Sequence, residues 1–195
     1  MFYIVALGNP GDEYVTTRHN VGWQALDFCI EKFSLPTLFE SKAYAGRISV
    51  GVVAGQEITV LYPDTFMNNS GSAVAKLVPK NDIEKLVVVH DDIDVPFGEI
   101  KIGQGRGAGG NNGVQSIIDK MGSKEFVRIR VGIAPKSFWT GETKRPAGGG
   151  PLERFVLKPF TASEQKNLLP VFEKVKSALE MIMSEGVEKA MNRYN

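Results

Sequence analysis

The feature that most constrains the fold is the apolar run Leu86-Val87-Val88-Val89, which leads directly into the polar segment 90–94. A short, continuous, β-branched run predicts a strand buried on both faces, because a strand with one solvated face alternates apolar and polar side chains. Such a strand needs helices on both sides of its sheet, so the run favours an α/β fold. The apolar segment 2–7 predicts a second buried strand, followed by a turn at Gly8-Asn9-Pro10-Gly11.

The rest of the chain continues this α/β pattern. Further strands are predicted at 44–53, 57–62, 98–102 and 126–133, and helices at 21–33, 70–78 and 114–121. A last helical segment begins with a capping-box pattern at 161–164, and Pro170 is expected to kink or divide it. With 195 residues and no repeat or linker, we predict one domain over 1–195, a mixed twisted β-sheet with helices packed around it.

The sequence has no stretch typical of a membrane span or a secretion signal. No window approaches 18 consecutive apolar residues, and no basic region precedes the apolar N-terminus. With one cysteine, Cys29, and two histidines, His19 and His90, neither an internal disulfide nor a zinc site is expected. These features predict a soluble cytoplasmic protein.

The charge of the chain is unevenly distributed along its length. Residues 101–158 contain 11 Lys or Arg residues and four acidic residues, a net charge of +7, although the whole chain has a net charge of only +1. A basic segment on a near-neutral chain is typical of contact with a polyanion. The alternative is an ordinary surface on which charges of both signs mix once the chain has folded.

Two segments inside or beside this basic region bear on function. The predicted strand at 126–133 alternates, so Arg128 and Arg130 share one face, and we expect a half-exposed basic strand. Residues 135–151 contain four glycines, three prolines and three basic residues. That composition and length predict a mobile, lid-type loop.

The polar residues favour general-base chemistry over a covalent enzyme intermediate. The sequence has no Gly-x-Ser-x-Gly motif, and Cys29 lies in an apolar helical stretch typical of a buried residue. His19, in a polar loop after the first strand, is the best candidate base, although a lone loop histidine is more often only a surface residue. His90 ends the buried run and is interpreted as structural.

An acidic cluster, Asp91, Asp92 and Asp94, lies at the carboxyl end of the buried strand, where the sites of α/β sheets gather. A solvated turn or a divalent-cation site would give the same cluster, and strand alternation would separate Asp91 from Asp92. A carboxylate bonded to a histidine ring fixes the tautomer and stabilises the imidazolium. An Asp–His pair with an ordered water would therefore suffice for ester hydrolysis.

Five asparagines occur in or beside turns rich in Gly and Ser, at positions 9, 68, 69, 111 and 112. Asparagine tolerates left-handed turns, which is one explanation for them. Amides also donate and accept hydrogen bonds at once, so several together could grip a peptide backbone and polarise a carbonyl. The glycine-rich loop 105–110 is a weak match to the dinucleotide motif G-x-G-x-x-G, and it suits any phosphate.

Seven segments form an ordered set that is far more specific than any one of them. They are GNPGDEY at 8–14, TRHNVG at 17–22, PDTFMNNSG at 63–71, HDDIDVPFG at 90–98, GGNNG at 109–113, RIRVGI at 128–133 and KAMNR at 189–193. Over nearly the whole chain, this set resembles the bacterial-type peptidyl-tRNA hydrolase family.

The resemblance implies hydrolysis of the ester that joins a peptide to the 3′ adenosine ribose of tRNA, which recycles prematurely released peptidyl-tRNA. It implies that His19 is the general base, that Asp91 holds and polarises it, and that Asn9 contacts the substrate near the ester. Contacts to the peptide and to the acceptor stem and 3′ CCA end of the tRNA are implied for Tyr14, Phe66, Met67, Asn68, Asn112, Lys101 and Arg130. The family implies no metal or organic cofactor, and a monomer.

The chain departs from the family pattern at three places. Asn111 stands where the family usually has histidine, Arg106 interrupts a stretch of small residues, and the 135–151 loop is longer than usual. Two other functions stay open, a non-catalytic RNA-binding module on the same scaffold and a nucleotide-binding oxidoreductase that uses the glycine-rich loop. The intact set of His19, Asp91 and asparagines favours the hydrolase.

Overall fold

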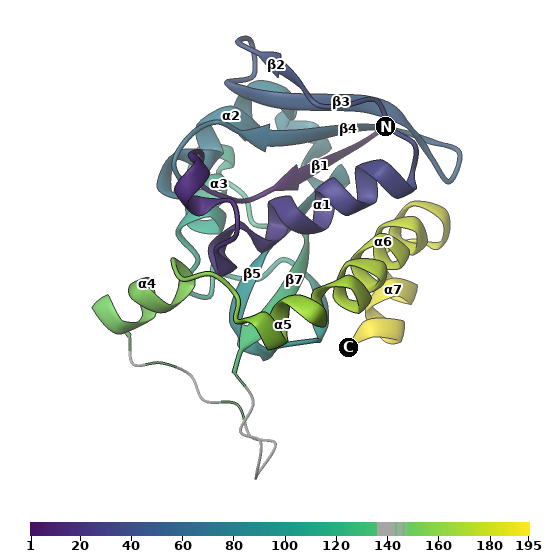
Figure 1. Ribbon diagram of the computed structural model, residues 1–195. Helices are drawn as coiled ribbons and strands as arrows, with labels where there is room; N and C mark the ends of the chain where they lie inside the picture. The colour runs from purple at the N-terminus through teal and green to yellow at the C-terminus, as the bar shows by residue number, and fades with distance from the viewer. Residues whose placement is uncertain (136–142, 144–145, 147) are drawn as a thin grey trace.

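A seven-stranded mixed β-sheet forms the centre of the computed structural model, which describes residues 1–135, 143, 146 and 148–195 (Figure 1). The strands lie in the order β2-β3-β4-β1-β5-β7-β6. Four neighbouring strands are parallel, namely β4 (Gln56–Pro63), β1 (Phe2–Ala6), β5 (Leu86–Pro96) and β7 (Val127–Ala134). The others pair antiparallel, namely β2 (Phe39–Ser41), β3 (Gly46–Val53) and β6 (Ile100–Gln104). The predicted α/β domain with a mixed sheet is confirmed.

Helices cover both faces of the sheet (Figure 1). One face carries α1 (Val21–Lys32), α6 (Leu168–Glu185) and α7 (Val187–Tyr194), and the other carries α2 (Ser70–Leu77) and α3 (Asn112–Met121). Short helices and turns connect these layers, namely α4 (Gly150–Val156), α5 (Ala162–Lys166), η1 (Asp12–Tyr14), η2 (Arg18–Asn20), η3 (Met67–Asn69) and η4 (Lys80–Lys85). None of the helices in the described residues has the length and apolar character needed to cross a membrane.

The pleat of β5 divides the core between the two helical layers. Val87 and Val89 pack with the α1 and α6 layer, whereas Leu86 and Val88 pack with the α2 and α3 layer. All four side chains are fully buried. Because neither face of β5 meets water, a polar side chain in this run would lose hydration without gaining a partner, which explains the continuous apolar sequence.

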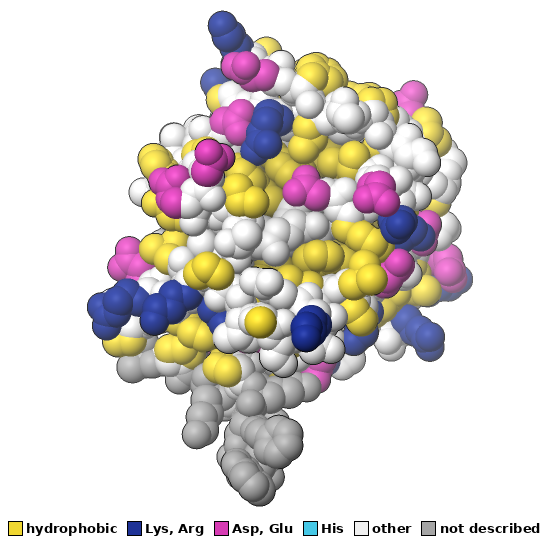
Figure 2. Space-filling model, in the orientation of Figure 1, with side chains coloured by type: hydrophobic (Ala, Val, Ile, Leu, Met, Phe, Trp, Pro, Cys, Tyr) yellow, Lys and Arg dark blue, Asp and Glu magenta, His cyan; other side chains and the backbone are white. Residues whose placement is uncertain are grey.

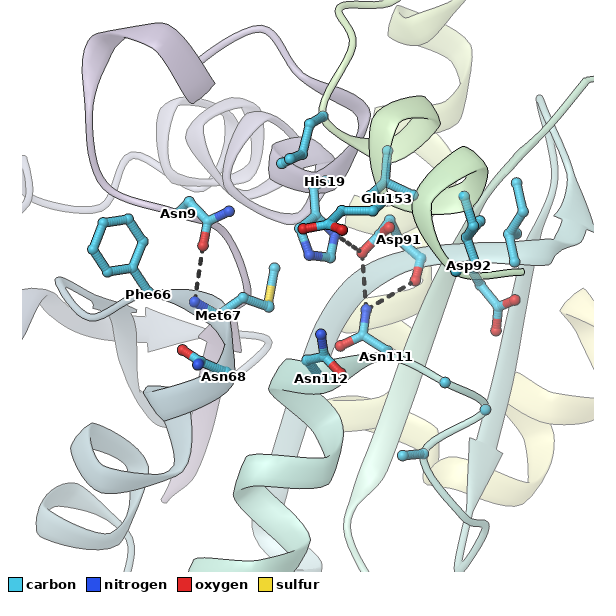
Figure 3. Close-up of a pocket in the computed structure, with 18 of the residues that line it drawn as sticks. Asn9, His19, Phe66, Met67, Asn68, Asp91, Asp92, Asn111, Asn112 and Glu153 are labelled. Atoms are coloured by element: carbon cyan, nitrogen blue, oxygen red, sulfur yellow. Dashed lines mark hydrogen bonds and ion pairs between the residues drawn. The ribbon is translucent and has the colours of Figure 1, made fainter. Parts of the chain in front are cut away.

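The strand β5 extends beyond its apolar run. It continues through the polar residues to Pro96, and it pairs with β7 as far as Asp92 before the register shifts. The polar backbone stays extended because β7 supplies its hydrogen-bond partners. As strand alternation requires, Asp91 and Asp92 point to opposite faces, as Figure 3 shows.

Gly22 allows α1 to approach the sheet closely. A Cβ atom at this position would stand 2.5 Å from the carbonyl oxygen of Val89 and 2.7 Å from that of Leu7. A residue without a side chain is therefore required where α1 begins. Because His19 lies in η2, directly before α1, this contact also places His19 beside the ends of β1 and β5.

The predicted half-exposed basic strand is wrong at Arg128. Only 3% of Arg128 is exposed, and its Nη1 donates to the carbonyl oxygen of Gly107 at 2.9 Å. Burial lowers the pKa of Arg128, and the neighbouring charge of Arg130 adds to this. The glycine-rich loop covers Arg128 on β7. Alternation predicts that Arg128 and Arg130 are both partly exposed, but only Arg130 is.

The segment after β7 is not one continuous loop over 135–151 as predicted. Helix α4 begins inside that range, at Gly150, with Pro151 at a position where its missing N–H breaks no intrahelical hydrogen bond. Residues 136–142, 144, 145 and 147, on which the predicted lid depends, lie outside the described residues.

The last helical segment is divided, as Pro170 led us to expect. The capping box at Thr161 is present and opens α5. Asn167 then separates α5 from α6, and Pro170 lies in the first turn of α6. Proline is tolerated in a first helical turn, whereas in a continuous helix it would remove an interior hydrogen bond.

Candidate active site

A cavity of about 570 Å³ opens where the parallel strands end (Figure 3). Loops that follow neighbouring parallel strands converge at one edge of a sheet, which is where α/β proteins hold their ligands. Here the converging segments follow β1 and β4 and continue β5, and α4 lies across the opening. Of the residues singled out by sequence, those lining the cavity are Asn9, His19, Phe66, Met67, Asn68, Asp91, Asp92, Asn111 and Asn112.

His19 and Asp91 meet at this cavity. The distance between His19 Nδ1 and Asp91 Oδ1 is 3.0 Å, and the side chains are 12% and 5% exposed. A carboxylate only accepts hydrogen bonds, so Nδ1 carries the proton and Nε2 keeps its lone pair. The pair therefore has the arrangement that prepares an imidazole to take a proton at Nε2.

The electrostatics of this pair make His19 more basic. Burial alone would disfavour the charged imidazolium, but the negative charge of Asp91 and its hydrogen bond outweigh burial. The pKa of His19 is consequently raised above 6.5. An imidazole with a raised pKa accepts a proton more readily, but it must first lose its own proton as the pH rises.

Asn9 is held so that its amide nitrogen is left for the cavity. Its main-chain N–H donates to Asn20 Oδ1, and its main-chain carbonyl accepts from Asn20 Nδ2, both at 2.9 Å. Its side-chain Oδ1 accepts from the main-chain N–H of Met67 at 2.8 Å. Because the oxygen is occupied, the amide N–H groups of Asn9 are the ones available to a substrate, as Figure 3 shows.

Asn111, one of the turn asparagines that the sequence singles out, has a partner in the site that sequence reasoning missed. Its Nδ2 donates to Asp91 Oδ1 at 2.9 Å, and its Oδ1 caps α3 by accepting from the main-chain N–H groups of Gly113 and Val114. The pattern Asn-Asn-Gly before a helix could have indicated the cap, but nothing in the sequence indicated the contact with Asp91.

The left-handed-turn explanation for the asparagines is wrong. Within the described part of the chain, the non-glycine residues with positive φ are Ser34, Ala45 and Ala54. All five asparagines therefore have ordinary backbone conformations, so left-handed turns do not account for their presence.

The glycine-rich loop is not arranged as a dinucleotide cradle. Its Gly107 carbonyl accepts from Arg128, and the first free N–H groups of α3 are already bonded to Asn111. A phosphate at this helix start would have to displace that side chain. The geometry therefore gives the oxidoreductase alternative no support.

Asn68, Asn112 and Phe66 are exposed to solvent at the edge of the cavity. Phe66 is 60% exposed, which is unusual for a large apolar ring. Tyr14 is not among the residues that line the cavity, so its predicted contact with the terminal nucleotide stays a prediction. Met67 is buried and closes the cavity between Asn9 and α3.

The buried side chain of Arg18 joins the His19 turn to the segment between α4 and α5. Its Nη2 is 2.7 Å from Glu164 Oε2, and its Nη1 donates to the carbonyl of Pro159 at 2.8 Å. Its guanidinium also lies 4.4 Å from the centre of the Phe155 ring. These contacts fix the turn that carries His19 against the end of α4, a role that the sequence did not reveal.

His90 has the structural position that the sequence predicted. It is 1% exposed, and its Nδ1 donates to the main-chain carbonyl of Asp91 at 2.7 Å. Burial lowers the pKa of His90, so its imidazole is neutral at pH 7.

The acidic cluster is divided between two partners instead of forming a cation site. Asp91 contacts His19, whereas Asp92 Oδ2 lies 3.2 Å from Arg130 Nη1 and Asp92 Oδ1 accepts from the main-chain N–H of Asp94. Among the described residues, no group of three or more His, Cys, Asp or Glu side chains could hold a metal ion.

Lys101 and Arg130 lie outside the cavity, on the strands beside it. The register of β6 and β7 pairs Lys101 with Arg130, so the two share a face of the sheet, and Lys101 Nζ donates to the carbonyl of Asn195. On the face seen in Figure 2, basic side chains gather at the level of α4, below a band richer in acidic ones.

Comparison with known proteins shows the family of the chain. The family model described as peptidyl-tRNA hydrolase matches residues 3–195. The peptidyl-tRNA hydrolase of Syntrophotalea carbinolica is 39% identical to this chain, and the match covers 100% of this chain and 97% of that protein. The peptidyl-tRNA hydrolase of Thermodesulfovibrio yellowstonii is also 39% identical, and the match covers 100% of this chain and 99% of that protein. The crystal structure of peptidyl-tRNA hydrolase from Acinetobacter baumannii has a TM-score of 0.88 and 29% identity, covering 100% of this chain and 94% of that chain. The chain therefore belongs to the peptidyl-tRNA hydrolase family, whose members are carboxylic ester hydrolases.

Proposed function

We propose that this enzyme hydrolyses the ester between the tRNA 3′ adenosine ribose and a peptide or N-blocked aminoacyl group, with His19 activating the attacking water. The observation that carries the proposal is the 3.0 Å contact between His19 Nδ1 and Asp91 Oδ1 in a cavity lined by amides. Family membership supports the substrate class. Hydrolysis of prematurely released peptidyl-tRNA would return the tRNA to use.

In the proposed reaction, His19 Nε2 takes a proton from water while the water oxygen bonds to the ester carbonyl carbon. Asp91 holds the required tautomer and stabilises the imidazolium that forms. The resulting tetrahedral intermediate breaks its bond to the ribose 3′ oxygen, which receives the proton from His19. The products are a free carboxylic acid and a tRNA with its 3′ hydroxyl restored.

The surrounding side chains suit recognition of this substrate. The free amide N–H groups of Asn9 are proposed to donate to the ester carbonyl, where negative charge develops. Asn68 and Asn112 can bind the peptide backbone, which is the same in every peptide. The exposed ring of Phe66 offers a surface on which the terminal adenine can stack, with Met67 beneath it.

The basic residues beside the cavity are proposed to bind tRNA phosphates. Lys101, Arg106 and Arg130 belong to the basic segment, and Arg130 is linked to the cavity edge through Asp92. Phosphate contacts do not depend on base sequence, which fits a substrate class that includes many tRNAs. Action in the cytoplasm, as a monomer, stays a prediction.

Arg130→Ala is expected to raise KM for full-length N-blocked aminoacyl-tRNA about tenfold, because a charge-assisted hydrogen bond contributes about 1.5 kcal/mol or more. KM for a minimal N-blocked aminoacyl-adenosine should stay within about twofold, and the dependence of tRNA binding on salt should weaken. Lys85→Ala is the matched control, because Lys85 directly precedes β5, at the end of that strand away from Asp92, and it too pairs with an aspartate. Equal losses on both substrates would place Arg130 at the ester or in the fold instead.

The proposed function is tested by incubating the protein with N-blocked aminoacyl-tRNA and with free aminoacyl-tRNA, and measuring ester release. We expect turnover of the blocked substrate and much slower turnover of the free one. A protein that binds both tRNAs but releases neither product at any enzyme concentration would be an RNA-binding module, and the proposal would be wrong.

A further inference from the structure

A single oxygen atom of Asp91 serves two partners. Asp91 Oδ1 lies 3.0 Å from His19 Nδ1 and accepts from Asn111 Nδ2 at 2.9 Å. Figure 3 shows both interactions meeting at this carboxylate, one from each side. Asn111 Nδ2 also lies 3.4 Å from the main-chain oxygen of Asp91. The amide therefore contacts the carboxylate and the backbone of the same residue.

The orientation of the Asn111 amide is fixed from its other end. Its Oδ1 accepts from the main-chain N–H groups of Gly113, at 3.0 Å, and Val114, at 3.1 Å. The oxygen and nitrogen of an amide point in different directions, so the helix cap commits the nitrogen to Asp91. Reversing the amide would break all of these contacts together.

We infer that Asn111 is a positioning residue of the hydrolase, which uses the rigid start of α3 to hold the Asp91 carboxylate in the orientation that His19 requires. This inference rests on the proposed function of His19. Asn111 lines the cavity, but both hydrogen-bonding atoms of its side chain, Oδ1 and Nδ2, already have protein partners. It acts on the reaction through Asp91 and His19.

A neutral donor has a consequence that a titrating donor would not have. The amide of Asn111 stays uncharged at every pH of interest, whereas histidine, which the family usually has here, would gain a proton beside Asp91 at acidic pH. The other ionisable groups near the pair are His90, which is neutral, Asp92, which faces Arg130, and Glu153 of α4, which lines the cavity. The protonation of His19 is thus expected to govern the acidic side of the pH profile.

Asn111→Ser separates positioning from capping. Serine keeps an oxygen that can cap α3, but it has no amide to donate to Asp91. We expect kcat to fall about tenfold, since small misplacements of catalytic groups carry costs of this order. KM should stay within about twofold, and the melting temperature should stay close to that of the wild type. Asn111→Ala should show the same loss in kcat together with a lower melting temperature.

Asn111→Asp provides a second measurement that does not depend on the size of the rate loss. Aspartate also caps helices well, but it replaces the donor with a negative charge beside the pair. The midpoint at which kcat/KM rises with pH should move upward, because a second negative charge raises the pKa of His19. The titration of His19 followed by NMR should move in the same direction.

Two results would overturn the inference. One is a wild-type kcat in Asn111→Ser, and the other is a raised KM with unchanged kcat, which would make Asn111 a substrate contact. The failure of the proposed function looks different, because the wild type would then release no product, and a wrong role for His19 would leave His19→Ala with wild-type turnover. If His19→Ala is inactive while Asn111→Ser is unaffected, only the role of Asn111 is wrong.

Discussion

Replacing His19 with alanine is expected to lower kcat/KM for N-blocked aminoacyl-tRNA by roughly 10²–10⁴-fold, the usual contribution of a general base. The loss should fall mainly on kcat, because the imidazole acts on water and not on the parts of the tRNA that supply affinity. Residual activity would come from the amides that bind the ester. The measurement is steady-state ester release at saturating and subsaturating substrate.

His19→Asn is the control for effects on structure. Its amide can still donate to Asp91, so the buried carboxylate keeps a partner, but it cannot take up a proton at neutral pH. Both variants should bind tRNA with near wild-type affinity and should unfold cooperatively, as shown by thermal melting. Turnover close to that of the wild type in either folded variant would exclude His19 as the base.

Asp91→Asn is expected to lower kcat by roughly 10²–10⁴-fold, because an amide in place of the carboxylate can hold the histidine in the wrong tautomer. In this site, the ring N–H of His19 and the amide N–H of Asn111 would compete for the same acceptor. The Oδ1 atom that serves His19 also serves Asn111, and an asparagine at 91 would have one oxygen for two donors. If its amide nitrogen turned to His19 Nδ1, then Nε2 would carry the proton and could not accept another.

The pH profile of Asp91→Asn identifies the cause of that loss. The charge of Asp91 and its hydrogen bond are what outweigh burial in raising the pKa of His19. Without them, burial dominates, so the acidic midpoint of the remaining activity should fall below that of the wild type. An unchanged midpoint would mean that another group titrates in this range.

The sequence predicted the fold from its apolar pattern, and it identified His19 and Asp91 as separate candidates. The apolar run before Asp91 identified a strand buried on both faces, and His19 followed the other predicted buried strand. Parallel strands place their carboxyl ends together, which favours a site at this edge, but the pairing of His19 with Asp91 was implied by the family resemblance. The residue types required for ester hydrolysis were thus predictable, as was their approximate meeting place.

The contacts that hold the pair were not predictable in the same way. Asn111 bonds to Asp91 because a helix cap fixes its amide, and Arg18 is buried because Glu164 and the carbonyl of Pro159 lie beside it. These partners are distant in sequence, and each depends on exact packing. Strand alternation likewise predicted that Arg128 is exposed, but the glycine-rich loop covers it. The sequence of that loop has no periodic pattern from which its position could be predicted.

The most direct test of this account measures the pH dependence of kcat/KM from about pH 5 to 9 beside the NMR titration of His19 in the same protein. The rate should rise with pH through a single midpoint above 6.5, because the pKa of His19 is raised and only its neutral form accepts a proton. That midpoint should coincide with the pKa of His19 measured by NMR. A flat profile, or a midpoint that differs from that of the imidazole, would contradict the role of His19 as the general base.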